Sequence, residues 1–483
     1  MSIANSLKQK GLLIEKAYLC GTWFDCDDKI NVINPATEEI IGTVPNTPSD
    51  KVLEAIKDSV SAQEHFKFSS PEARSHLLKK WYEAMMQHSR EFAELITLEN
   101  GKTIKESLAE IEYAAAYLKW YAEEAIKDRM YSIPSNNYFQ TRVVDYVPVG
   151  VTAAVTPWNF PLAMITRKAG AAIAAGCSML IKPSELTPFT ALLMCKLALD
   201  SGMPSNLIQV ITGDAKRIAE IFHGAYAIRK ISFTGSTRIG KAIMKGCSDS
   251  LQRVAMELGG NAPLIINSDA DPDVMINMVL NGKFRNNGQS CTAVNRILVH
   301  ESRYEKTVNH IYEKVSRLKV GDGFDENSDL GTVITEDSLN RLIRLIDITV
   351  RQGAKLMLGG KRFGNKGYFL EPTIFTEVTN TMEIVKGEIF GPIITIQKFS
   401  SEEEAIAMAN DTDYGLAAYI CGVNPERNKR MAERLNFGMI GINDTRISDA
   451  KIPFGGTKNS GFGREGGREG IYEYLEPKYY GIA

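Results

Sequence analysis

Between Gly150 and Met256 the sequence alternates short apolar runs with segments of helical periodicity, and this alternation restricts the fold more than any other feature. The apolar runs predict strands at 151–155, 179–181, 207–211, 231–234 and 253–256, and the periodic segments predict helices at 164–175, 190–199, 216–222 and 238–246. Strands that alternate with helices of this length pair in parallel, with helices on both faces of the sheet. We therefore expect an α/β fold built on a doubly wound parallel sheet.

The flanking parts of the chain carry patterns of their own. Residues 49–128 are helical by pattern, and Ser70 followed by Pro71 is a typical helix start. Between residues 262 and about 443 the sequence again predicts alternating strands and helices. The helices are predicted near 271–285, 302–318, 336–352, 402–410 and 425–435. We expect a second α/β domain there, and the aromatic tail at 472–483 is typical of an edge strand that pairs with another segment.

Composition excludes several classes of protein. Of the 483 residues, 44% are apolar and 24% are charged, as in ordinary soluble globular chains. The formal net charge of −2 at pH 7 argues against a nucleic-acid or anionic-membrane partner. No apolar run reaches the ~18 residues of a membrane-spanning helix, and the first 14 residues lack the apolar core of a secretory signal. The seven Cys form no CxxC pair, so we expect reduced thiols, a cytoplasmic location and no metal site.

Two segments that follow predicted strands have the composition of nucleotide-binding loops. Residues 233–240 read FTGSTRIG and open a helix, so that free backbone N–H groups can face a phosphate. Lys182 and Glu185, in IKPSE, lie just past another strand, where they can hold the hydroxyls of a ribose. A doubly wound sheet binds nucleotides at the carboxyl ends of its strands. The alternatives are a Gly–Ser turn that only caps a helix and a surface salt bridge.

Three residues form a candidate catalytic set. Cys291 ends a polar, Gly-containing turn, NNGQSC, and Glu257 follows an apolar strand directly before two glycines. A thiol that forms a covalent intermediate and a carboxylate that activates water make a two-step catalyst. Asn159 lies in TPWNFP, where two prolines fix the loop, and its amide can stabilise an oxyanion. The alternatives are a buried structural thiol and an Asn that bonds the loop backbone.

These motifs resemble those of the aldehyde dehydrogenase superfamily in their order and spacing. The segments that carry the likeness are TPWNFP, KPSE, FTGSTRIG, ELGGNAP, NNGQSC, GEIFGP and PFGGTKNSG. The likeness extends from VINPAT, which begins at Val32, to Tyr474. Within the superfamily, the chain most resembles the succinate-semialdehyde dehydrogenases.

The resemblance implies roles for the candidate residues. Cys291 would attack the aldehyde, Asn159 and the Cys291 backbone N–H would stabilise the oxyanion, and Glu257 would activate the water that hydrolyses a thioester. Cofactor contacts would come from Thr156, Pro157, Trp158, Lys182, Ser184, Glu185, Gly235, Ser236, Leu258, Glu388 and Phe390. Because the Glu185 carboxylate would repel a 2′-phosphate, we expect NAD as the cofactor, with NADP as a weaker second.

The resemblance also implies a substrate with a carboxylate. Arg167 and Arg285 match the positions that bind it, and Ser448 matches a serine that assists. The planar fork of arginine meets a carboxylate with two hydrogen bonds, although both arginines can instead form structural ion pairs. Among such substrates, we expect succinate semialdehyde to be the preferred one. Glutarate semialdehyde and 2-oxoglutarate semialdehyde are close rivals, because one methylene is worth only ~1–3 kcal/mol in a pocket. A generic aldehyde dehydrogenase and a non-enzymatic binding or structural member are further alternatives.

The same resemblance divides the chain into three parts. These are an NAD(P)-binding domain of residues 1–129 and 148–256, a catalytic domain of residues 257–445 with the nucleophilic Cys, and a small β oligomerisation flap of residues 130–147 and 466–483. Strands near 138–146 and the tail from Tyr472 would pair between subunits, since an exposed apolar edge is otherwise a liability. We therefore expect a homodimer or a homotetramer.

Overall fold

The alternating segment forms the centre of an eight-stranded sheet in the computed structural model, which describes residues 2–136 and 138–483. Met1 and Asn137, which fall within the predicted cofactor domain and flap, lie outside the described residues. The sheet has the order β19-β11-β10-β7-β8-β9-β1-β2. Its parallel strands are β7 (Val151–Val155), β8 (Met179–Lys182), β9 (Ile208–Val210), β10 (Ile228–Thr234) and β11 (Arg253–Glu257). The predicted strands and their parallel pairing are confirmed.

Short antiparallel strands extend this sheet at both edges. They are β1 (Ala17–Leu19), β2 (Thr22–Phe24) and β19 (Gly461–Phe462). A separate hairpin pairs β3 (Lys29–Ile33) with β4 (Ile40–Pro45). β19 brings the chain from the far C-terminal region to the end of β11, where Gly461 pairs with Glu257. A segment about 200 residues later in the sequence therefore supports the candidate general base.

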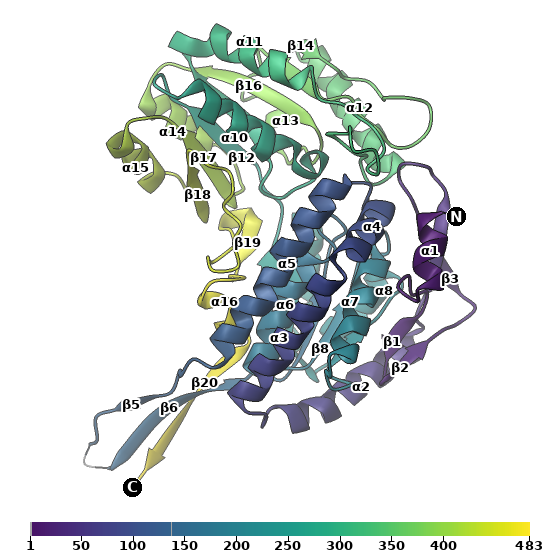
Figure 1. The fold of residues 1–483 in the computed structure, drawn as a ribbon. Coiled ribbons are helices and arrows are strands. Elements are labelled where there is room, and N and C mark those ends of the chain that lie inside the picture. The colour runs from purple at the N-terminus through teal and green to yellow at the C-terminus, as the bar shows by residue number, and fades with distance from the viewer. Residues whose placement is uncertain (1, 137) are drawn as a thin grey trace.

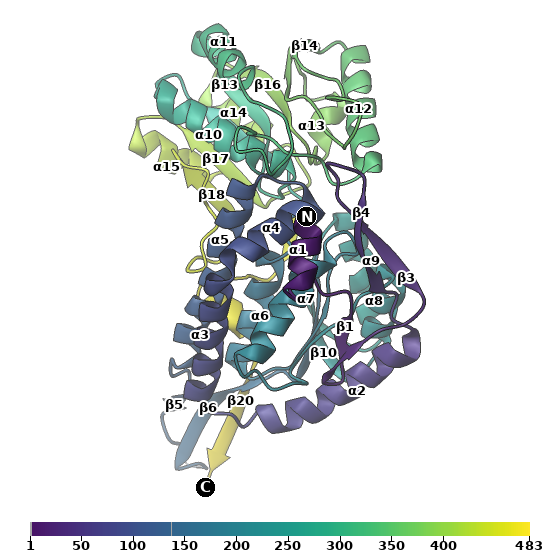
Figure 2. The same cartoon turned by 45° about the vertical axis from the view of Figure 1, so that its right-hand side comes forward.

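Helices cover both faces of the first sheet (Figures 1 and 2). One face carries α3 (Pro71–Gln87), α4 (Ser89–Asn100), α5 (Ile104–Ala125), α6 (Ala163–Ala175) and α7 (Pro188–Asp200). The other carries α2 (Ser49–Phe66), α8 (Ala215–Gly224) and α9 (Thr237–Cys247), while α1 (Ile3–Gln9) lies against the first group. In β7, Ala154 faces one core and Ala153 and Val155 face the other, so every residue of the strand is buried.

The second lobe is built on a seven-stranded sheet of order β14-β15-β16-β13-β12-β17-β18. Its strands are β12 (Ala262–Ile266), β13 (Val294–His300), β14 (Lys355–Leu358), β15 (Thr373–Thr376), β16 (Ile393–Phe399), β17 (Ala417–Cys421) and β18 (Met439–Ile442), and β14 alone among them is antiparallel. Its helices are α10 (Pro272–Phe284), α11 (Tyr304–Val315), α12 (Glu336–Arg351), α13 (Glu383–Lys386), α14 (Glu402–Asn410) and α15 (Pro425–Glu433). The five predicted helices are confirmed, and α13 is an addition.

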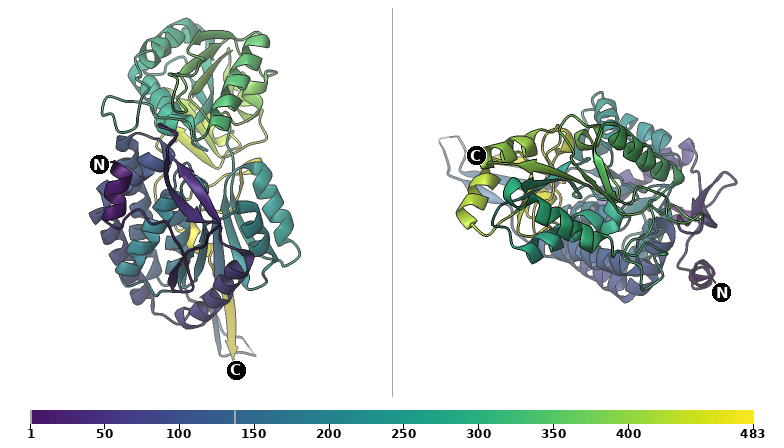
Figure 3. Two further views of the ribbon diagram at one scale, coloured as in Figure 1. Left: turned by 90° about the vertical axis from the view of Figure 1, so that its right-hand side faces the viewer. Right: turned by 90° about the horizontal axis from the view of Figure 1, so that it is seen from above.

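A three-stranded antiparallel ribbon projects from the first lobe, on the side away from the second lobe (Figure 3). It consists of β5 (Tyr131–Ile133), β6 (Thr141–Pro148) and β20 (Leu475–Ile482), and α16 (Glu469–Tyr472) leads into β20. The strand near 138–146 and the tail pair with each other within one chain, and their predicted pairing between subunits stays a prediction. β20 pairs along its whole length with β6 of its own chain, from Leu475 opposite Pro148 to Ile482 opposite Thr141. These hydrogen bonds pair the facing edges of β6 and β20. The other edge of β20 has no partner strand among the described residues.

Two further observations concern membranes and metals. Among the helices that the structure describes, none is long and apolar enough to cross a membrane. Over the same residues, His, Cys, Asp and Glu side chains form no cluster that could hold a metal ion.

Candidate active site

The candidate nucleophile lies at the end of a turn with unusual backbone geometry. Asn286, Asn287 and Gly288, between α10 and β13, have consecutive positive φ angles of 49°, 56° and 74°. Asn tolerates this left-handed region better than other side chains, and Gly adopts it without strain. A Cβ at Gly288 would lie 2.2 Å from the carbonyl oxygen of Gly391, so only glycine fits there. The turn places Cys291 at a partly exposed position where the two lobes meet.

Buried neighbours determine the state of the Cys291 thiol. The residue packs against a small apolar cluster that contains Leu416 and Phe454. Burial and the neighbouring Glu257 carboxylate raise the pKa of the thiol well above its ordinary value, and the Arg167 guanidinium opposes this rise. These surroundings therefore favour the neutral thiol over the thiolate.

The Asn159 loop is fastened to the nucleophile turn. The Asn159 side-chain amide donates to the carbonyl of Gln289 at 3.1 Å, and the Asn159 carbonyl accepts from Asn286 Nδ2 at 2.7 Å. Lys102 Nζ donates to the same carbonyl at 2.7 Å and forms a fully buried ion pair with Glu110 at 2.6 Å. These bonds keep the amide of Asn159 next to the turn that carries the nucleophile, as an oxyanion site requires.

Lys102 and Glu110 are positioning residues that the sequence did not reveal. Glu110 also accepts the backbone N–H groups of Leu162 and Ala163, at 2.9 and 3.3 Å, where α6 begins. Glu110 lies in a helix whose periodicity alone does not distinguish a buried acid from a solvated one. The contacts span more than 50 residues, so no local signal identifies them.

Glu257 is the last residue of β11 and is held by a buried cation. Its Oε2 accepts from Arg167 NH2 at 3.1 Å, and both side chains are almost completely buried. Arg167 also forms an ion pair with Glu465, and Glu465 pairs with Lys168 at 2.7 Å. Although burial alone would raise it, Lys168 and Arg167 hold the pKa of Glu465 below its ordinary value. Glu257 thus belongs to a network of two anions and two cations behind the nucleophile (Cys291).

The sequence carries a partial signal for this network. Every residue of α6 is buried, and Arg167 and Lys168 are adjacent charges in an otherwise apolar helix. Buried cations need partners, so this pair predicts acids nearby. Glu465 itself lies about 300 residues later in the sequence, and no pattern in the chain connects it to α6.

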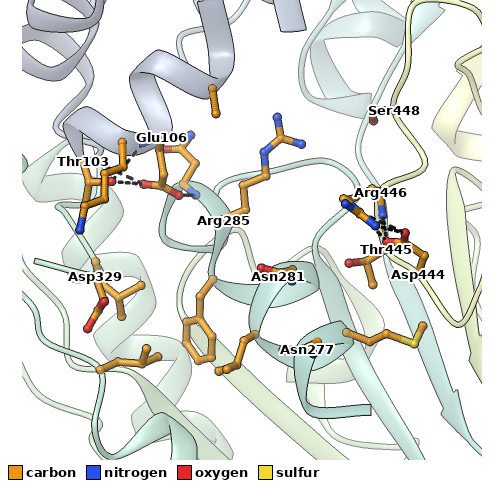
Figure 4. A pocket seen from close by; sticks show the side chains of 18 of the residues that line it. Thr103, Glu106, Asn277, Asn281, Arg285, Asp329, Asp444, Thr445, Arg446 and Ser448 are labelled. Carbon is orange, nitrogen blue, oxygen red and sulfur yellow. Dashed lines mark hydrogen bonds and ion pairs between the residues drawn. The ribbon is translucent and has the colours of Figure 1, made fainter. Parts of the chain in front are cut away.

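A cavity of about 1040 Å³ opens beside the nucleophile turn (Figure 4). Its walls come from the start of α5, from α10 and from the segment 443–448. Arg285 is exposed in this cavity, and its guanidinium lies 4.7 Å from the ring centre of Phe160 and 5.6 Å from that of Tyr113. Such cation–π contacts orient an arginine without neutralising it. Ser448 lines the same cavity.

The three residues predicted to bind a carboxylate are therefore not equivalent. Arg285 and Ser448 line the cavity, whereas Arg167 is 1% exposed and lies behind the wall, where its NH1 donates to the Tyr113 hydroxyl at 3.2 Å. Within residues 2–136 and 138–483, no carboxylate lies within ion-pair distance of Arg285. Glu106, on the same wall, is bonded to Thr103 and to the backbone N–H of Asn286. Arg446 also lines the cavity (Figure 4), but it forms an ion pair with Asp444 at 2.7 Å, so Arg285 is the lining arginine that no described carboxylate neutralises.

The residues predicted to hold a cofactor lie along one edge of the first sheet. Thr156, Lys182, Gly235 and Leu258 stand at the carboxyl ends of β7, β8, β10 and β11, which are neighbours in the sheet. Ligands of doubly wound sheets bind at this edge. Ser236 caps α9 by accepting the N–H of Ile239, and among the described residues the N–H groups of Thr237 and Arg238 meet no acceptor, as a phosphate site requires.

Two local observations fit a dinucleotide at this edge. Thr156 Oγ1 is a buried hydroxyl that has no hydrogen-bond partner among the residues that the structure describes. A Cβ at Gly240 would lie 2.4 Å from the Leu258 side chain, so this glycine lets α9 pack against the strand end. This edge of the sheet thus combines the close packing of Gly240 against Leu258 with the Thr156 hydroxyl, which is available to a bound dinucleotide.

The predicted ribose residues form a small hydrogen-bonded group. Lys182 Nζ pairs with Glu185 Oε1 at 2.8 Å, and the same oxygen accepts from the backbone N–H of Ala215. Ser184 Oγ accepts from the N–H of Leu186. Lys182 is buried and Glu185 is partly exposed, so the pair is more than a surface salt bridge.

The second lobe completes the cofactor edge with Glu388 and Phe390. Glu388 is buried, accepts the backbone N–H of Gly260 at 3.0 Å, and has a pKa raised to about 7, chiefly by burial. The Phe390 ring meets the ring of Trp158 edge-on at 5.5 Å, and Trp158 follows Pro157 in the loop after β7. All eleven predicted cofactor residues thus lie at the end of the first sheet or directly across from it.

Comparisons with known proteins agree on one family. The family model described as "Aldehyde dehydrogenase family" matches residues 23–480. A mitochondrial succinate-semialdehyde dehydrogenase of Arabidopsis thaliana is 43% identical over 99% of this chain and 91% of its own length. A glutarate-semialdehyde dehydrogenase of Pseudomonas putida is 42% identical over 99% of this chain and 99% of its own length. The crystal structure of an NADP-dependent enzyme of Escherichia coli matches with a TM-score of 0.97 at 40% identity, over 98% of this chain and 99% of that one.

Proposed function

Because the chain belongs to the aldehyde dehydrogenase family, we propose that it oxidises a short aldehyde with a terminal carboxylate, and that succinate semialdehyde is its preferred substrate. The observation that carries this proposal is the cavity guanidinium of Arg285, which two aromatic rings orient and which no carboxylate neutralises within the described part of the chain. A guanidinium offers a carboxylate two parallel hydrogen bonds, and Ser448 adds a hydroxyl in the same cavity. The relatives named for succinate and glutarate semialdehyde support this substrate class.

The proposed chemistry proceeds in two stages on Cys291. Once the Cys291 thiol has lost its proton to water, its sulfur adds to the aldehyde carbon, and Asn159 with the Cys291 backbone N–H stabilises the oxyanion. Bound NAD(P), held by the residues at the end of the first sheet, would supply the acceptor for the hydride that leaves this carbon. The product of that stage is a thioester on Cys291, and Glu257 removes a proton from the water that hydrolyses it to the acid.

We propose NAD as the preferred cofactor, with NADP as the second. The Glu185 carboxylate, held by Lys182, would accept the two ribose hydroxyls of NAD and repel a 2′-phosphate. Lys182 and the Ser184 hydroxyl moderate that repulsion, and a similar Escherichia coli structure is described as NADP dependent. The ratio of kcat/KM for the two cofactors measures this preference.

Glutarate semialdehyde is the second candidate substrate. The cavity of about 1040 Å³ leaves room for a longer chain, and the Pseudomonas putida relative is named for that aldehyde. 2-Oxoglutarate semialdehyde shares the carboxylate and differs in oxidation state. One methylene discriminates by only ~1–3 kcal/mol, so we expect kcat/KM for succinate and glutarate semialdehyde to differ by about 10- to 200-fold.

A steady-state panel tests the proposed substrate class. It compares the three carboxylate-bearing aldehydes with butanal and betaine aldehyde, each with NAD and with NADP. We expect the highest kcat/KM for a carboxylate-bearing aldehyde. Equal or higher values for butanal or for the cationic aldehyde would contradict the proposal and leave a generic aldehyde dehydrogenase.

We further propose a cytoplasmic location and self-association as a homodimer or homotetramer. All seven Cys residues are free thiols, which suits a reducing compartment. The two edge strands of the projecting ribbon carry exposed apolar side chains, among them Tyr131 on β5 and Ile482 on β20. Such an edge is usually covered by another chain.

A further inference from the structure

Glu106 connects the start of α5, in the first lobe, to the turn that carries the nucleophile, in the second. Its Oε2 accepts from the backbone N–H and from the hydroxyl of Thr103, both at 3.3 Å, and completes a capping box at the first turn of the helix (Figure 4). Its Oε1 accepts from the backbone N–H of Asn286. One carboxylate at the cavity wall therefore bonds an element of each lobe.

The start of α5 is itself fixed between the lobes. The backbone N–H of Ile104 donates to the carbonyl of Gly323 at 2.9 Å, and the Gly101 carbonyl accepts from the N–H of Thr332 at 3.2 Å. The backbone that carries Glu106 is thus held at a set distance from the nucleophile turn. The length of this side chain then decides whether its carboxylate reaches the turn.

The N–H of Asn286 needs an acceptor from outside the turn. Asn286 and Asn287 are buried and have φ angles of 49° and 56°. Left-handed conformations of non-glycine residues are strained, and they persist only where surrounding contacts fix them. A buried N–H without an acceptor is costly as well. The bond to Glu106 therefore stabilises the turn at the residue where the strain begins.

Asn159 makes the other hydrogen bonds from the first lobe to this turn among the described residues. Its carbonyl accepts from Asn286 Nδ2, and its amide donates to the Gln289 carbonyl. That amide is also the proposed donor to the oxyanion, so its hydrogen bonds are divided between the turn and the substrate. The bond of Glu106 to the turn has no such second duty.

We propose that Glu106 is a positioning residue for Cys291: through the N–H of Asn286 it holds the nucleophile turn against the first lobe, for charged and uncharged aldehydes alike. Glu106 acts as a hydrogen-bond acceptor of fixed reach, and its negative charge is secondary. Burial raises the pKa of the Glu106 carboxyl, while the Asn286 N–H and Lys102 oppose the rise. A carboxyl group keeps an acceptor oxygen in either protonation state. The inference rests on the proposed role of Cys291 as the nucleophile.

Two conservative substitutions separate reach from charge. Glu106→Gln keeps the length and an acceptor oxygen but removes the charge, whereas Glu106→Asp keeps the charge but shortens the side chain by one methylene. We expect Glu106→Gln to keep a kcat close to that of the unaltered enzyme. In Glu106→Asp, kcat should fall at least about tenfold with both succinate semialdehyde and butanal, since a displacement of about 1 Å at a reacting group can cost 10²-fold. KM for both aldehydes and the Kd for NAD should change little.

Hydrogen–deuterium exchange reports on the same bond without turnover. The Asn286 amide should exchange at least about tenfold faster in Glu106→Asp, because the loss of one hydrogen bond to a charged acceptor corresponds to that factor or more. Its protection should persist in Glu106→Gln. Glu112→Asp is the matched control, since Glu112 is an exposed acid of the same helix that has no hydrogen bond or ion pair within residues 2–136 and 138–483.

Four results would overturn the proposal. Unchanged kcat and exchange in Glu106→Asp would show that the bond does not position the nucleophile. The reverse order, with Glu106→Gln impaired and Glu106→Asp normal, would make Glu106 an electrostatic residue. A loss confined to succinate semialdehyde would place the effect on Arg285, and equal losses in both variants with a lower Tm would make the contact structural only. A wrong substrate assignment would alter the ratio between the two aldehydes in the unaltered enzyme and leave the order of the variants intact.

Discussion

At the residue scale, the proposed covalent chemistry depends on one sulfur atom, that of Cys291. Cys291→Ala removes that atom, while the cofactor residues lie on other side chains along the sheet edge. We expect dehydrogenase turnover to fall to background and NAD binding, measured by calorimetry, to survive. Turnover near that of the unaltered enzyme would exclude the thioester route.

Hydrolysis of the thioester depends on the charge of Glu257. Glu257→Gln keeps the shape of the side chain and removes its basicity, so hydrolysis should slow by more than hydride transfer does. Stopped-flow absorbance should show a burst of NADH followed by turnover about 100-fold or more below normal, since general bases contribute typically 10²–10⁴-fold. A normal steady-state rate without a burst would remove Glu257 from this role.

Individual residues differ in how far the sequence predicted them. Cys291, Glu257 and Asn159 stand in short motifs after strands, and parallel topology brings strand ends together, so their meeting could be anticipated. The ion pair of Arg167 with Glu465 could not be anticipated, because Glu465 reaches α6 only through the long return of the chain to β19. No pattern in the chain distinguishes the buried Arg167 from the exposed Arg285.

At the scale of single elements, the turn before Cys291 depends on a glycine. Gly288→Ala places a Cβ 2.2 Å from the Gly391 carbonyl at a φ of 74°. Left-handed strain and overpacking each cost about 1–3 kcal/mol, so the urea midpoint and kcat should both fall. Gly364→Ala is the matched control, because Gly364 has a φ of 71° and open space around it. Equal losses in the two variants would show that the close approach to Gly391 does not matter.

The predicted elements agree with the structure wherever local pattern decides them. The strands of the first sheet and the five helices of the second lobe follow from periodicity, and their ends differ by a few residues because pairing extends them, as when Ile228 joins β10 by pairing with Val151. The left-handed Asn286 and Asn287 had no such signal. Their conformation is imposed by the packing of the turn against the Asn159 loop and Gly391.

At the scale of the whole molecule, the projecting ribbon predicts assembly. The pairing of β20 with β6 within one chain satisfies the inner edges, but the outer edge of β20 keeps Tyr480 and Ile482 exposed, at 41% and 61%. Light scattering should give a mass of two or four chains, and charged substitutions, Tyr480→Glu with Ile482→Glu, should lower it. Tyr226→Glu, at an exposed aromatic outside the ribbon, is the control. A fully active monomer would contradict the predicted assembly.

The central claim is that Arg285 recognises the distal carboxylate of the substrate, and the kinetics of Arg285→Leu test it most directly. A hydrogen-bonded contact with a charged group contributes about 1.5–3 kcal/mol, so kcat/KM for succinate semialdehyde should fall roughly 10- to 150-fold. The loss for butanal should be much smaller, because butanal has no carboxylate to lose. The altered enzyme would then discriminate poorly between the two aldehydes. Equal losses for both would contradict the claim and make Arg285 a structural residue of the cavity wall.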